Sequence, residues 1–423
     1  MELLLGDLVS FASGNTPSKS NPEFWGGETP WISANAMHSP FLNDSELRLT
    51  KTAVLEKAKL CAEGDILLLV RGSGLHSRLP VGVAEIPLAF NQDVKAIRSV
   101  DDRLDQQYLF YWFRGNQDFL LESVEYTGIG AGKLDTDFLK KITLNLPCLS
   151  EQHSIAHIGR CLDRKIELNQ KMNQTLEEIA KAIFKSWFVD FDPVRAKAEG
   201  RPTGLPPEIS DLFPDEFVDS EIGQIPKGWS QESIYQFCSV EYGAPFKSKL
   251  FNEDGQGIPL VRIRDLPKGK SGVFTEEVHP KGTLIKAGDL VVGMDGEFRC
   301  YLWRGIDSWM NQRVCKFVPK ENVPSTFIWF ALERPLHFIE STEVATTVIH
   351  LGKGDIDDFQ FIQSSQELLD QFSKFTSPLL ERMVIASKEI EILAELRDTL
   401  LPKLISGELR IPEAEKFLEE AGI

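Results

Sequence analysis

The longest regular pattern of hydrophobic and polar positions runs from Ser150 to Phe188. Apolar side chains recur there three and four residues apart without a proline, which predicts one long helix with a coiled-coil seam. One seam position falls on Ile155, Leu162, Asn169, Leu176 and Ile183, and the other on Ile158, Lys165, Met172, Ile179 and Ser186. The polar residues Lys165 and Asn169 lower the stability of such a seam but fix its register.

The same pattern returns about 217 positions later, so that Phe372 answers Ile155. Pro378 and Pro402 bracket this second segment, and Ser377 can cap a new helix with Pro378 at its first position. We therefore predict a second helix over roughly 378–401. The two helices are expected to bury their seams against each other, with contacts through Ile155, Leu162, Leu176, Ile179, Ile183, Leu379, Leu393, Leu396 and Leu400.

The segments outside the helices form two similar halves with mixed strand and helix patterns. Short anchors repeat between them in the same order. They are Gly14–Pro17 with Gly243–Pro245, Pro30–Ala34 with Pro259–Arg264, Gly64–Leu67 with Gly288–Val291, Asn91–Val94 with Asn311–Val314, and Gly132–Lys133 with Gly352–Lys353. The anchors are shared, but the residues between them differ. This pattern indicates two domains of the same kind that act on two different targets.

The domain organisation follows from these patterns. The predicted segments are a first α/β domain at 1–149, a long helix at 150–190, a proline-rich acidic linker at 191–230, a second α/β domain at 231–365, a second helical segment at 366–409 and a tail at 410–423. The predicted fold class is α+β, with two tandem α/β domains separated by long helices that pack as an antiparallel two-helix coiled coil.

Composition limits the number of domains, the cellular compartment and the binding partners that we expect for the chain. Its 423 residues are 42% hydrophobic, enough for two or three domains with real cores. No apolar run approaches a membrane span, and the first residues lack the basic start of a signal peptide. The six cysteines form no CxxC pair, as expected of reduced thiols in a cytoplasmic protein. The net charge of −17 argues against a simple basic nucleic-acid binder, although local basic patches remain compatible with it.

Several motifs suggest catalysis and fail on detail. The glycine-rich segment 128–134 lacks the spacing of a phosphate-binding loop, and Leu134 stands where that motif has Ser or Thr. The segment 21–24 departs from the NPPF-like motif of amino-methyltransferases, and no glycine-rich cofactor loop accompanies it. Phe213-Pro-Asp215 has no partner Glu-x-Lys of a nuclease. His153 and His157 face one way on the long helix but make an incomplete metal site. We therefore predict no catalytic and no metal-binding residues.

Basic and amide side chains near the expected strand ends are better candidates for binding. Arg and Lys neutralise phosphate, and Arg, Asn and Gln can also read base edges in the major groove. The candidates are Arg71, Gln92, Lys133, Arg262, Arg264, Gln312, Arg313 and Lys353. Gln92 and Gln312 hold matched places in the two halves, which favours binding over separate structural roles for the set as a whole.

Three stretches resemble one known family. Leu146–Ala156 resembles the LPxPxxEQxxIA junction of Type I restriction–modification specificity subunits, although Cys148 and Leu149 lack its second proline. The residues 173–191 resemble the end of the central conserved helix of that family, and 396–409 resemble its C-terminal conserved region. The second junction, at 364–371, is degenerate.

This resemblance implies a non-catalytic subunit with two target recognition domains, each of which reads one half of a bipartite DNA sequence. It implies double-stranded DNA, two methyltransferase subunits and restriction subunits as partners, and no membrane. S-adenosylmethionine and ATP with Mg²⁺ are then expected in the partner subunits and not in this chain. An antiparallel helix pair of roughly 24–35 residues would span about 36–52 Å, so we expect the helices to separate the half-sites by unread bases.

Two other classes of function remain open. A stand-alone nuclease or methyltransferase fused to a coiled coil would show metal-dependent or methyl-donor-dependent activity in the purified chain alone. A structural adaptor would use its two domains to bind proteins, and its complexes would be indifferent to the replacement of Arg71 and Arg262 by alanine.

Overall fold

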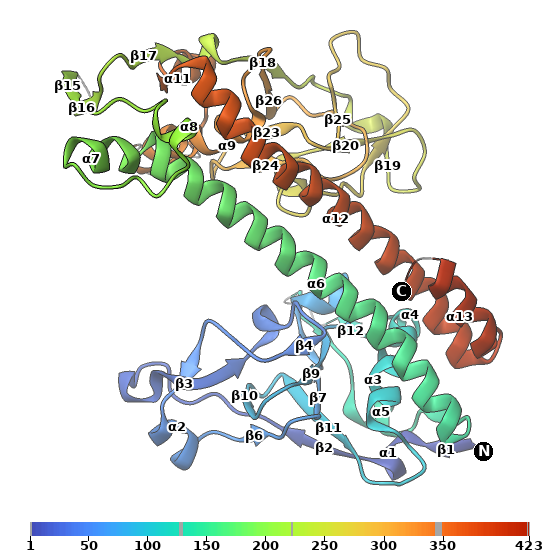
Figure 1. Ribbon diagram of the computed structural model, residues 1–423. Coiled ribbons are helices and arrows are strands. Elements are labelled where there is room, and N and C mark those ends of the chain that lie inside the picture. Colours follow the sequence, from blue (N-terminus) through green and yellow to red (C-terminus); the bar gives the residue numbers. More distant parts are fainter. Residues whose placement is uncertain (1, 127–129, 221–222, 343–348, 421, 423) are drawn as a thin grey trace. The chain divides into compact units, whose positions relative to one another are not determined.

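The chain folds into two compact units that share two long helices. A computed structural model describes residues 2–126, 130–220, 223–342, 349–420 and 422 (Figure 1). Unit 1 comprises Met1–Glu167 with Ile392–Ile423, and unit 2 comprises Leu168–Glu391. Helices α6 (Leu149–Phe188) and α12 (Gln366–Ser406) each contribute one end to unit 1 and the other end to unit 2. Both units combine helices with sheets, so the α+β prediction is confirmed.

Unit 1 is built on a five-stranded sheet of order β2-β11-β7-β9-β4 and a four-stranded sheet of order β5-β3-β10-β6. Its strands are β1 (Glu2–Leu4), β2 (Val9–Ser13), β3 (Trp25–Ile32), β4 (Phe41–Leu42), β5 (Arg48–Leu49), β6 (Leu60–Cys61), β7 (Ile66–Leu69), β8 (Arg71–Gly72), β9 (Val81–Ala84), β10 (Leu88–Phe90), β11 (Val94–Ser99), β12 (Glu125–Tyr126), β13 (Gly132–Lys133) and β14 (Thr143–Asn145). Its shorter helices are α1 (Leu5–Leu8), α2 (Lys51–Glu56), α3 (Gln106–Gly115), α4 (Gln117–Glu122), α5 (Thr136–Lys140) and α13 (Ile411–Glu420). All four residues of β7 are buried, as its continuous apolar run predicts.

Unit 2 repeats this plan with a four-stranded sheet of order β18-β26-β23-β24 and a five-stranded sheet of order β19-β21-β20-β25-β22. Its strands are β15 (Phe217–Ser220), β16 (Gly223–Pro226), β17 (Ser230–Ser233), β18 (Cys238–Tyr242), β19 (Phe251–Asn252), β20 (Ile258–Val261), β21 (Phe274–Thr275), β22 (Leu284–Ile285), β23 (Leu290–Gly293), β24 (Cys300–Leu302), β25 (Ser308–Met310), β26 (Val314–Pro319) and β27 (Gln360–Gln363). Its shorter helices are α7 (Asp192–Ala198), α8 (Pro207–Ser210), α9 (Ser325–Ala331), α10 (Glu333–Thr342) and α11 (Lys353–Asp357).

The repeat predicted from the sequence anchors is present in the backbone. One parallel strand pair corresponds between the units: Ile32 of β3 pairs with Phe90 of β10, and Val261 of β20 pairs with Met310 of β25. Unit 1 also pairs β4 with β9 in parallel. Gly14 lies against the end of β10, and Gly243 lies against the residue after β25. A Cβ atom on Gly14 would stand 2.1 Å from the Phe90 carbonyl oxygen, and one on Gly243 would stand 2.0 Å from that of Asn311. Only glycine fits such an approach, which explains why this anchor recurs.

The segment 191–230 connects α6 to the strands of unit 2 and is folded. It forms α7, α8 and the β15–β16 hairpin, and Phe191, Val194, Ile209 and Phe213 are buried in the core of unit 2. Phe191, the residue that precedes α7, adopts a left-handed conformation with φ of 54°, so the chain changes direction between α6 and α7. The sequence analysis predicted a linker here from the proline and acidic residues. It did not consider that these four apolar side chains could be buried in the core of unit 2.

The buried face of α6 differs in part from the predicted seam. Ile155 and Leu162 are buried as expected, but Ile179 is 44% exposed and lies outside the seam. Ile158, the first residue of the predicted second seam line, is buried as expected. Beyond it the buried residues fall one position later than predicted, on Ile166, Asn173, Ala180 and Trp187. Small Ala180 allows close packing, and the buried amide of Asn173 donates to Ser387 Oγ at 3.0 Å, so these residues occupy the seam in place of Met172 and Ile179.

The second helix, α12, occupies most of the predicted helical segment 366–409 and is longer than the helix predicted over 378–401. α12 continues through both Pro378 and Pro402, whereas the sequence pattern suggested that the prolines bound a helix over 378–401. A proline inside a helix removes one hydrogen bond and costs about 3 kcal/mol. Phe372 and Met383 on either side of Pro378, and Leu400 and Leu404 on either side of Pro402, are buried and offset this cost.

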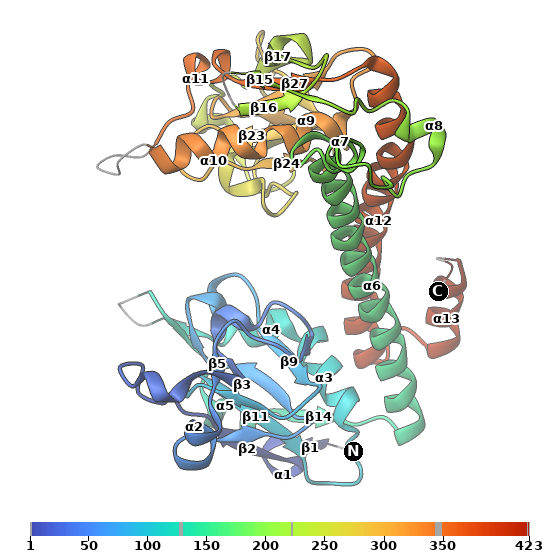
Figure 2. The same cartoon turned by 60° about the vertical axis from the view of Figure 1, so that its left-hand side comes forward.

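The two long helices pack antiparallel. In unit 2, Asn169 Nδ2 donates to Glu389 Oε2 at 3.0 Å, Asn173 meets Ser387, and the ring centroids of Phe188 and Phe372 lie 5.2 Å apart. Residue numbers therefore rise along α6 as they fall along α12. The ribbons of both helices are drawn in Figure 2. The predicted antiparallel helix pair is confirmed.

In unit 1 the helices are joined by a buried ion cluster. The carboxylate of Asp163 on α6 accepts hydrogen bonds from Arg114 on α3, from Tyr111 Oη at 3.1 Å and from Arg397 Nη1 on α12 at 2.8 Å. Its side chain is fully buried. Burial lowers the pKa of Arg114 and raises the pKa of Tyr111, while Asp163 opposes the first effect and adds to the second. Two guanidinium groups thus compensate one buried carboxylate and fix how α3, α6 and α12 meet.

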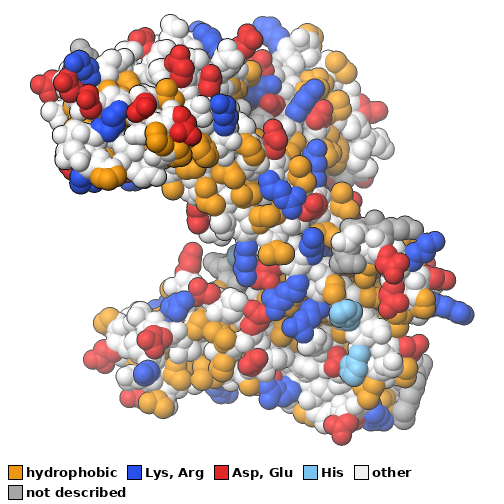
Figure 3. Space-filling view, in the orientation of Figure 1, with side chains coloured by type: hydrophobic (Ala, Val, Ile, Leu, Met, Phe, Trp, Pro, Cys, Tyr) orange, Lys and Arg blue, Asp and Glu red, His pale blue; other side chains and the backbone are white. Residues whose placement is uncertain are grey.

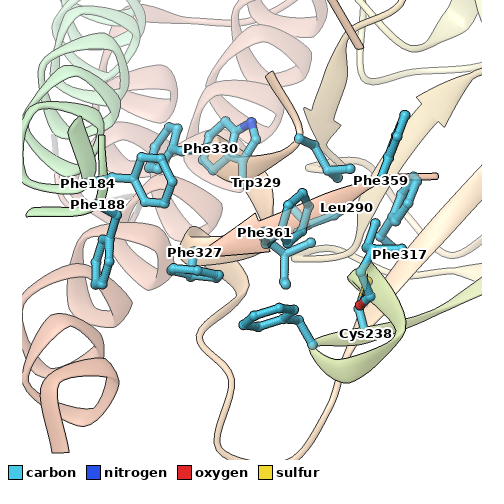
Figure 4. Close-up of a cluster of buried hydrophobic side chains, with 14 of the residues drawn as sticks. Phe184, Phe188, Cys238, Leu290, Phe317, Phe327, Trp329, Phe330, Phe359 and Phe361 are labelled. Carbon is cyan, nitrogen blue, oxygen red and sulfur yellow. Dashed lines mark hydrogen bonds between the residues drawn. The ribbon is translucent and has the colours of Figure 1, made fainter. Parts of the chain in front are cut away.

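Aromatic side chains attach α6 to the core of unit 2. Figure 4 shows Phe184 and Phe188 of α6 beside Phe327 and Phe330 of α9. Ring centroids of Phe188 and Phe327 lie 5.1 Å apart with the rings perpendicular, a favourable edge-to-face geometry. The helix is therefore a structural part of the domain and not a flexible connector.

Candidate nucleic-acid interface

In unit 1, candidate residues gather where the parallel strands β3 and β10 end. The backbone N–H of Asn91 donates to the Ile32 carbonyl at 3.0 Å, so the segments that follow the two strands leave the sheet at the same edge. Gln92 is exposed in this segment, and its Oε1 atom accepts a hydrogen bond of 2.7 Å from Thr16 Oγ1. Thr16 thereby orients the amide and leaves the Nε2 group as a donor to solvent or ligand.

Arg71 and Lys133 lie directly opposite each other on adjacent antiparallel strands, β8 and β13. Directly opposite residues project from the same face of a sheet with Cβ atoms about 4.5–5.5 Å apart. Two like charges at this distance repel unless an anion lies between them. Among the described residues, neither side chain has an acidic partner, so the pair is a candidate contact for phosphate.

Aromatic side chains lie next to this pair, because Tyr126 of β12 pairs with Gly132 of β13. His76 stacks on Tyr126 with ring centroids 4.8 Å apart, and its Nε2 atom lies 2.5 Å from the Gly130 carbonyl oxygen. Arg78 contacts His38 at 3.3 Å, and burial lowers the pKa of Arg78. The glycine-rich segment considered for phosphate binding begins at 128, and positions 127–129 lie outside the described residues.

In unit 2, the corresponding place holds a network of three side chains. Arg313 Nε lies 3.4 Å from Asp295 Oδ2, and Arg313 Nη1 lies 3.3 Å from His350 Nδ1. The same His350 nitrogen lies 2.7 Å from Asp295 Oδ1. Because this atom carries either a proton or a lone pair, it serves one of the two neighbours at a time. Asp295 is therefore the common partner that holds both side chains.

The other candidates of unit 2 lie nearby or are engaged locally. Gln312 is exposed beside Arg313, at the end of β25. Arg262 follows β20 but forms an ion pair with Asp265 at 2.9 Å, and its side chain is only 25% exposed. Arg264 is exposed on the short 3-10 helix Ile263–Asp265, and Lys353 is exposed at the start of α11.

Backbone hydrogen bonds establish which residues of the two units correspond. The N–H of Val70 donates to the Asp93 carbonyl at 2.8 Å, and the N–H of Met294 donates to the Arg313 carbonyl at 2.9 Å. The N–H of Leu134 then donates to Val70, as the N–H of Leu351 donates to Met294. Lys133 therefore corresponds to His350, and the sequence pairing of Gly132–Lys133 with Gly352–Lys353 was wrong by three residues.

This correspondence reveals an exchange of charge between the two units. Arg71 of unit 1 stands where unit 2 has Asp295, and Asp93 stands where unit 2 has Arg313. In unit 1, Asp93 accepts a hydrogen bond from Asn91 at 3.4 Å and makes no ion pair with Arg71. The backbone is therefore similar in the two units, but the basic side chains differ in position. They are Arg71 on β8 and Lys133 on β13 in unit 1, and Arg313 in the turn after β25 in unit 2.

The remaining features of the surface concern charge and metals. On the face drawn in Figure 3, basic and acidic side chains are interspersed over both units. Within the described ranges, no group of three or more His, Cys, Asp or Glu residues is arranged to hold a metal ion. His153 lies 3.6 Å from Asp105 and His157 lies near Cys161, so each has a local partner. The described helices include none with the length and hydropathy needed to cross a bilayer.

The chain matches a known family over both units. The model of the Type I restriction modification DNA specificity domain matches residues 2–178 and again residues 226–363. The chain belongs to the Type I restriction–modification specificity-subunit family. The two matched segments of this specificity subunit contain the two repeats, including the Arg71–Lys133 pair and the Arg313–Asp295–His350 network.

Curated relatives of this specificity subunit carry the same description. The "Type I restriction enzyme MjaIX specificity subunit" of Methanocaldococcus jannaschii is 29% identical over 96% of this chain and 93% of its own length. The "Type I restriction enzyme HindI specificity subunit" of Haemophilus influenzae is 28% identical over 64% of this chain and 70% of its own length. A crystal structure of the S subunit from M. genitalium shares the fold, with a TM-score of 0.56, 16% identity and coverage of 96% and 95% of the two chains.

Sequence reasoning missed three residues of this specificity subunit that the structure places beside the candidate residues. Asp295 and His350 were not candidates, because neither residue alone gives a sign in the sequence that it holds an arginine. Asp93 was not a candidate either, because its correspondence to Arg313 depends on the strand pairing. A comparison of the two repeats at the correct offsets would have shown Arg71 against Asp295 and Asp93 against Arg313. The missing information was the strand pairing that sets those offsets.

Proposed function

We propose that this chain is the DNA-recognition subunit of a Type I restriction–modification complex, in which each unit reads one half of a bipartite target. The observation that supports the proposal is that both units repeat the same strand pairing but carry different side chains at the corresponding positions. Two domains of the same architecture with exchanged charge at matched positions suit two different DNA half-sites. The match of the specificity-domain model to both repeats supports this interpretation.

The helix pair supports a role as spacer and docking scaffold. α6 and α12 are antiparallel and connect the two recognition domains, and each long helix retains exposed apolar side chains outside its seam. These include Leu168, Ile179, Ile385 and Ile392. Exposed apolar residues on a rigid helix pair are suited to bind partner proteins. We infer that two methyltransferase subunits dock on these helices and that restriction subunits join the complex.

The chemistry of the complex then belongs to the partners. We infer that S-adenosylmethionine, ATP and Mg²⁺ bind the methyltransferase and restriction subunits, and that this chain contributes recognition alone. Partner subunits would also supply positive surface, which offsets the net charge of −17 of this chain when DNA is bound. We place the complex in the cytoplasm, where reduced cysteines and DNA occur together.

The experiment is to co-express the chain with its methyltransferase partner and to map adenine methylation by single-molecule sequencing. We expect a two-part motif with a fixed unread gap. Methylation without such a motif, or the lack of a complex, would contradict the proposal and favour an adaptor. Methyl-donor-dependent activity in the purified chain alone would favour the stand-alone enzyme.

A further inference from the structure

Arg313 differs from the other exposed arginines at the interface in how it is held. Its Nε and Nη1 atoms face Asp295 and His350, while the side chain remains 49% exposed. Among the described residues, no acceptor engages its Nη2 group. One side of the guanidinium is therefore fixed by the protein, and the other side is free to bind.

This fixation lowers the cost of binding. A free arginine loses side-chain entropy when it is ordered by a ligand, and a carboxylate that holds the planar group in advance reduces that loss. The backbone of Arg313 is also fixed, because its carbonyl accepts the hydrogen bond from Met294. Gln312, which precedes it, is exposed at the place that Gln92 holds in unit 1.

The local charge determines which part of DNA suits this arginine. Asp295 neutralises Arg313 and its carboxylate repels phosphate, so the pair gains little from the release of counterions. Hydrogen bonds to a base edge depend on donor geometry more than on net charge. Arginine most commonly reads guanine, through the O6 and N7 acceptors in the major groove.

Unit 1 provides the contrasting case. Arg71 and Lys133 carry two positive charges on one face of the strand ladder, without an acidic partner among the described residues. Such a pair suits the phosphate backbone, which attracts any cation regardless of sequence. The exchange of charge thus separates a backbone contact in unit 1 from a base contact in unit 2.

We propose that Arg313 reads a guanine in the half-site recognised by unit 2, with Asp295 as the positioning residue that holds it. This inference rests on the proposed function of the chain. The two can be tested separately, because a two-part methylation motif of the unchanged complex tests the function, and the effect of substitutions on one base pair tests the role of Arg313.

The first experiment compares methylation motifs of four complexes: unchanged, Arg313→Ala, Arg313→Lys and Asp295→Asn. We expect the first two substitutions to relax the same single G·C position in one half-site, with the other half-site unchanged. Arg313→Lys keeps the charge but cannot bind both acceptors in the same geometry, so it distinguishes readout from charge. Asp295→Asn should relax that same position to a smaller extent while the complex still assembles.

A matched control is Arg299→Ala. Arg299 is 44% exposed and pairs with Glu297 at 2.9 Å and Glu340 at 2.7 Å, so it is also an arginine held by carboxylates. We expect its replacement to leave both half-sites of the motif unchanged. If Arg299→Ala also reduced the base preference at a position of the motif, the loss of any surface arginine would lower sequence specificity. The proposal would then be overturned.

The second experiment removes the acceptor instead of the donor. Duplexes with 7-deazaguanine at one position lack N7, and the complex should bind the duplex changed at the Arg313-dependent position about tenfold or more weakly. The Arg313→Ala complex should show no such difference. Equal weakening of all duplexes by Arg313→Ala, or relaxation at an A·T position, would show that Arg313 does not read guanine and would overturn the proposal.

Discussion

At the scale of residues, the two units arrange the positive charge of their candidate DNA-contacting side chains in different ways. Arg71 and Lys133 face each other without a counter-ion among the described residues, whereas Arg313 is held by Asp295. The first arrangement is stabilised when a phosphate neutralises it. The second is stable without DNA and keeps its donor geometry.

This difference predicts a change in salt dependence. Each phosphate contact contributes about 0.9 to the slope of log binding constant against log salt concentration. We therefore expect the double substitution Arg71→Ala with Lys133→Ala to reduce that slope by about 1.8 in the full complex, without any change in the methylation motif. Titrations by fluorescence anisotropy at several salt concentrations measure the slope.

The matched control for this pair is Lys140→Ala with Lys141→Ala, which removes two exposed charges from the end of α5 in the same domain. An unchanged slope is expected. If both double variants reduce the slope equally, the effect reflects net charge alone, and Arg71 and Lys133 do not contact phosphate.

At the scale of elements, the helix α6 shows how packing selects among overlapping hydrophobic patterns. Met172 and Ile179 gave the predicted seam more apolar surface than Asn173 and Ala180 provide. The structure buries Asn173 and Ala180, because a small residue allows close approach and a buried amide finds a partner on α12. Ile179 is left exposed.

Two substitutions at neighbouring positions test this seam. Ala180→Glu places a charge in a fully buried site and should lower the free energy of unfolding by about 2 kcal/mol or more. Ile179→Glu changes an exposed position and should alter it by no more than about 0.5 kcal/mol. Denaturant unfolding of the full chain gives both values. A larger effect of Ile179→Glu than of Ala180→Glu would show that Ile179, and not Ala180, belongs to the buried seam.

At the scale of the whole molecule, the long helices are the elements that both units share. α6 has 40 residues and α12 has 41, which corresponds to about 60 Å each at 1.5 Å per residue. Both ends of α6 are fixed, by the Asp163 cluster in unit 1 and by the aromatic contacts of Phe184 and Phe188 in unit 2. The length of the helices should therefore set the unread gap between half-sites.

Removal of one heptad tests this relation. Deletion of residues 165–171 alone should abolish binding or change the required gap, because it breaks the pairing of α6 with α12. Deletion of 389–395 in the same chain removes the facing heptad and shortens both helices by about 10.5 Å. The paired deletion should shorten the unread gap by about three base pairs at 3.4 Å each, as methylation mapping would show. An unchanged gap would exclude the helices as the spacer.

Much of the molecule follows from the sequence by itself. The heptad pattern determined that 150–188 is one long helix with a partner near the C-terminus, because periodic apolar positions need no knowledge of the rest of the fold. The anchors Gly14 and Gly243 revealed the repeat, since a glycine that lies against a backbone carbonyl cannot be replaced. The motifs at both helices were specific enough to indicate the family.

The tertiary structure decided what periodicity could not. Pro378 and Pro402 remain inside α12 because buried neighbours offset a local cost that the sequence presents as a helix end. The segment 191–230 folds because its few apolar residues find a core formed by distant strands. The contrast between Arg71 and Arg313 depends on residues far apart in the chain, which only the pairing of strands brings into contact.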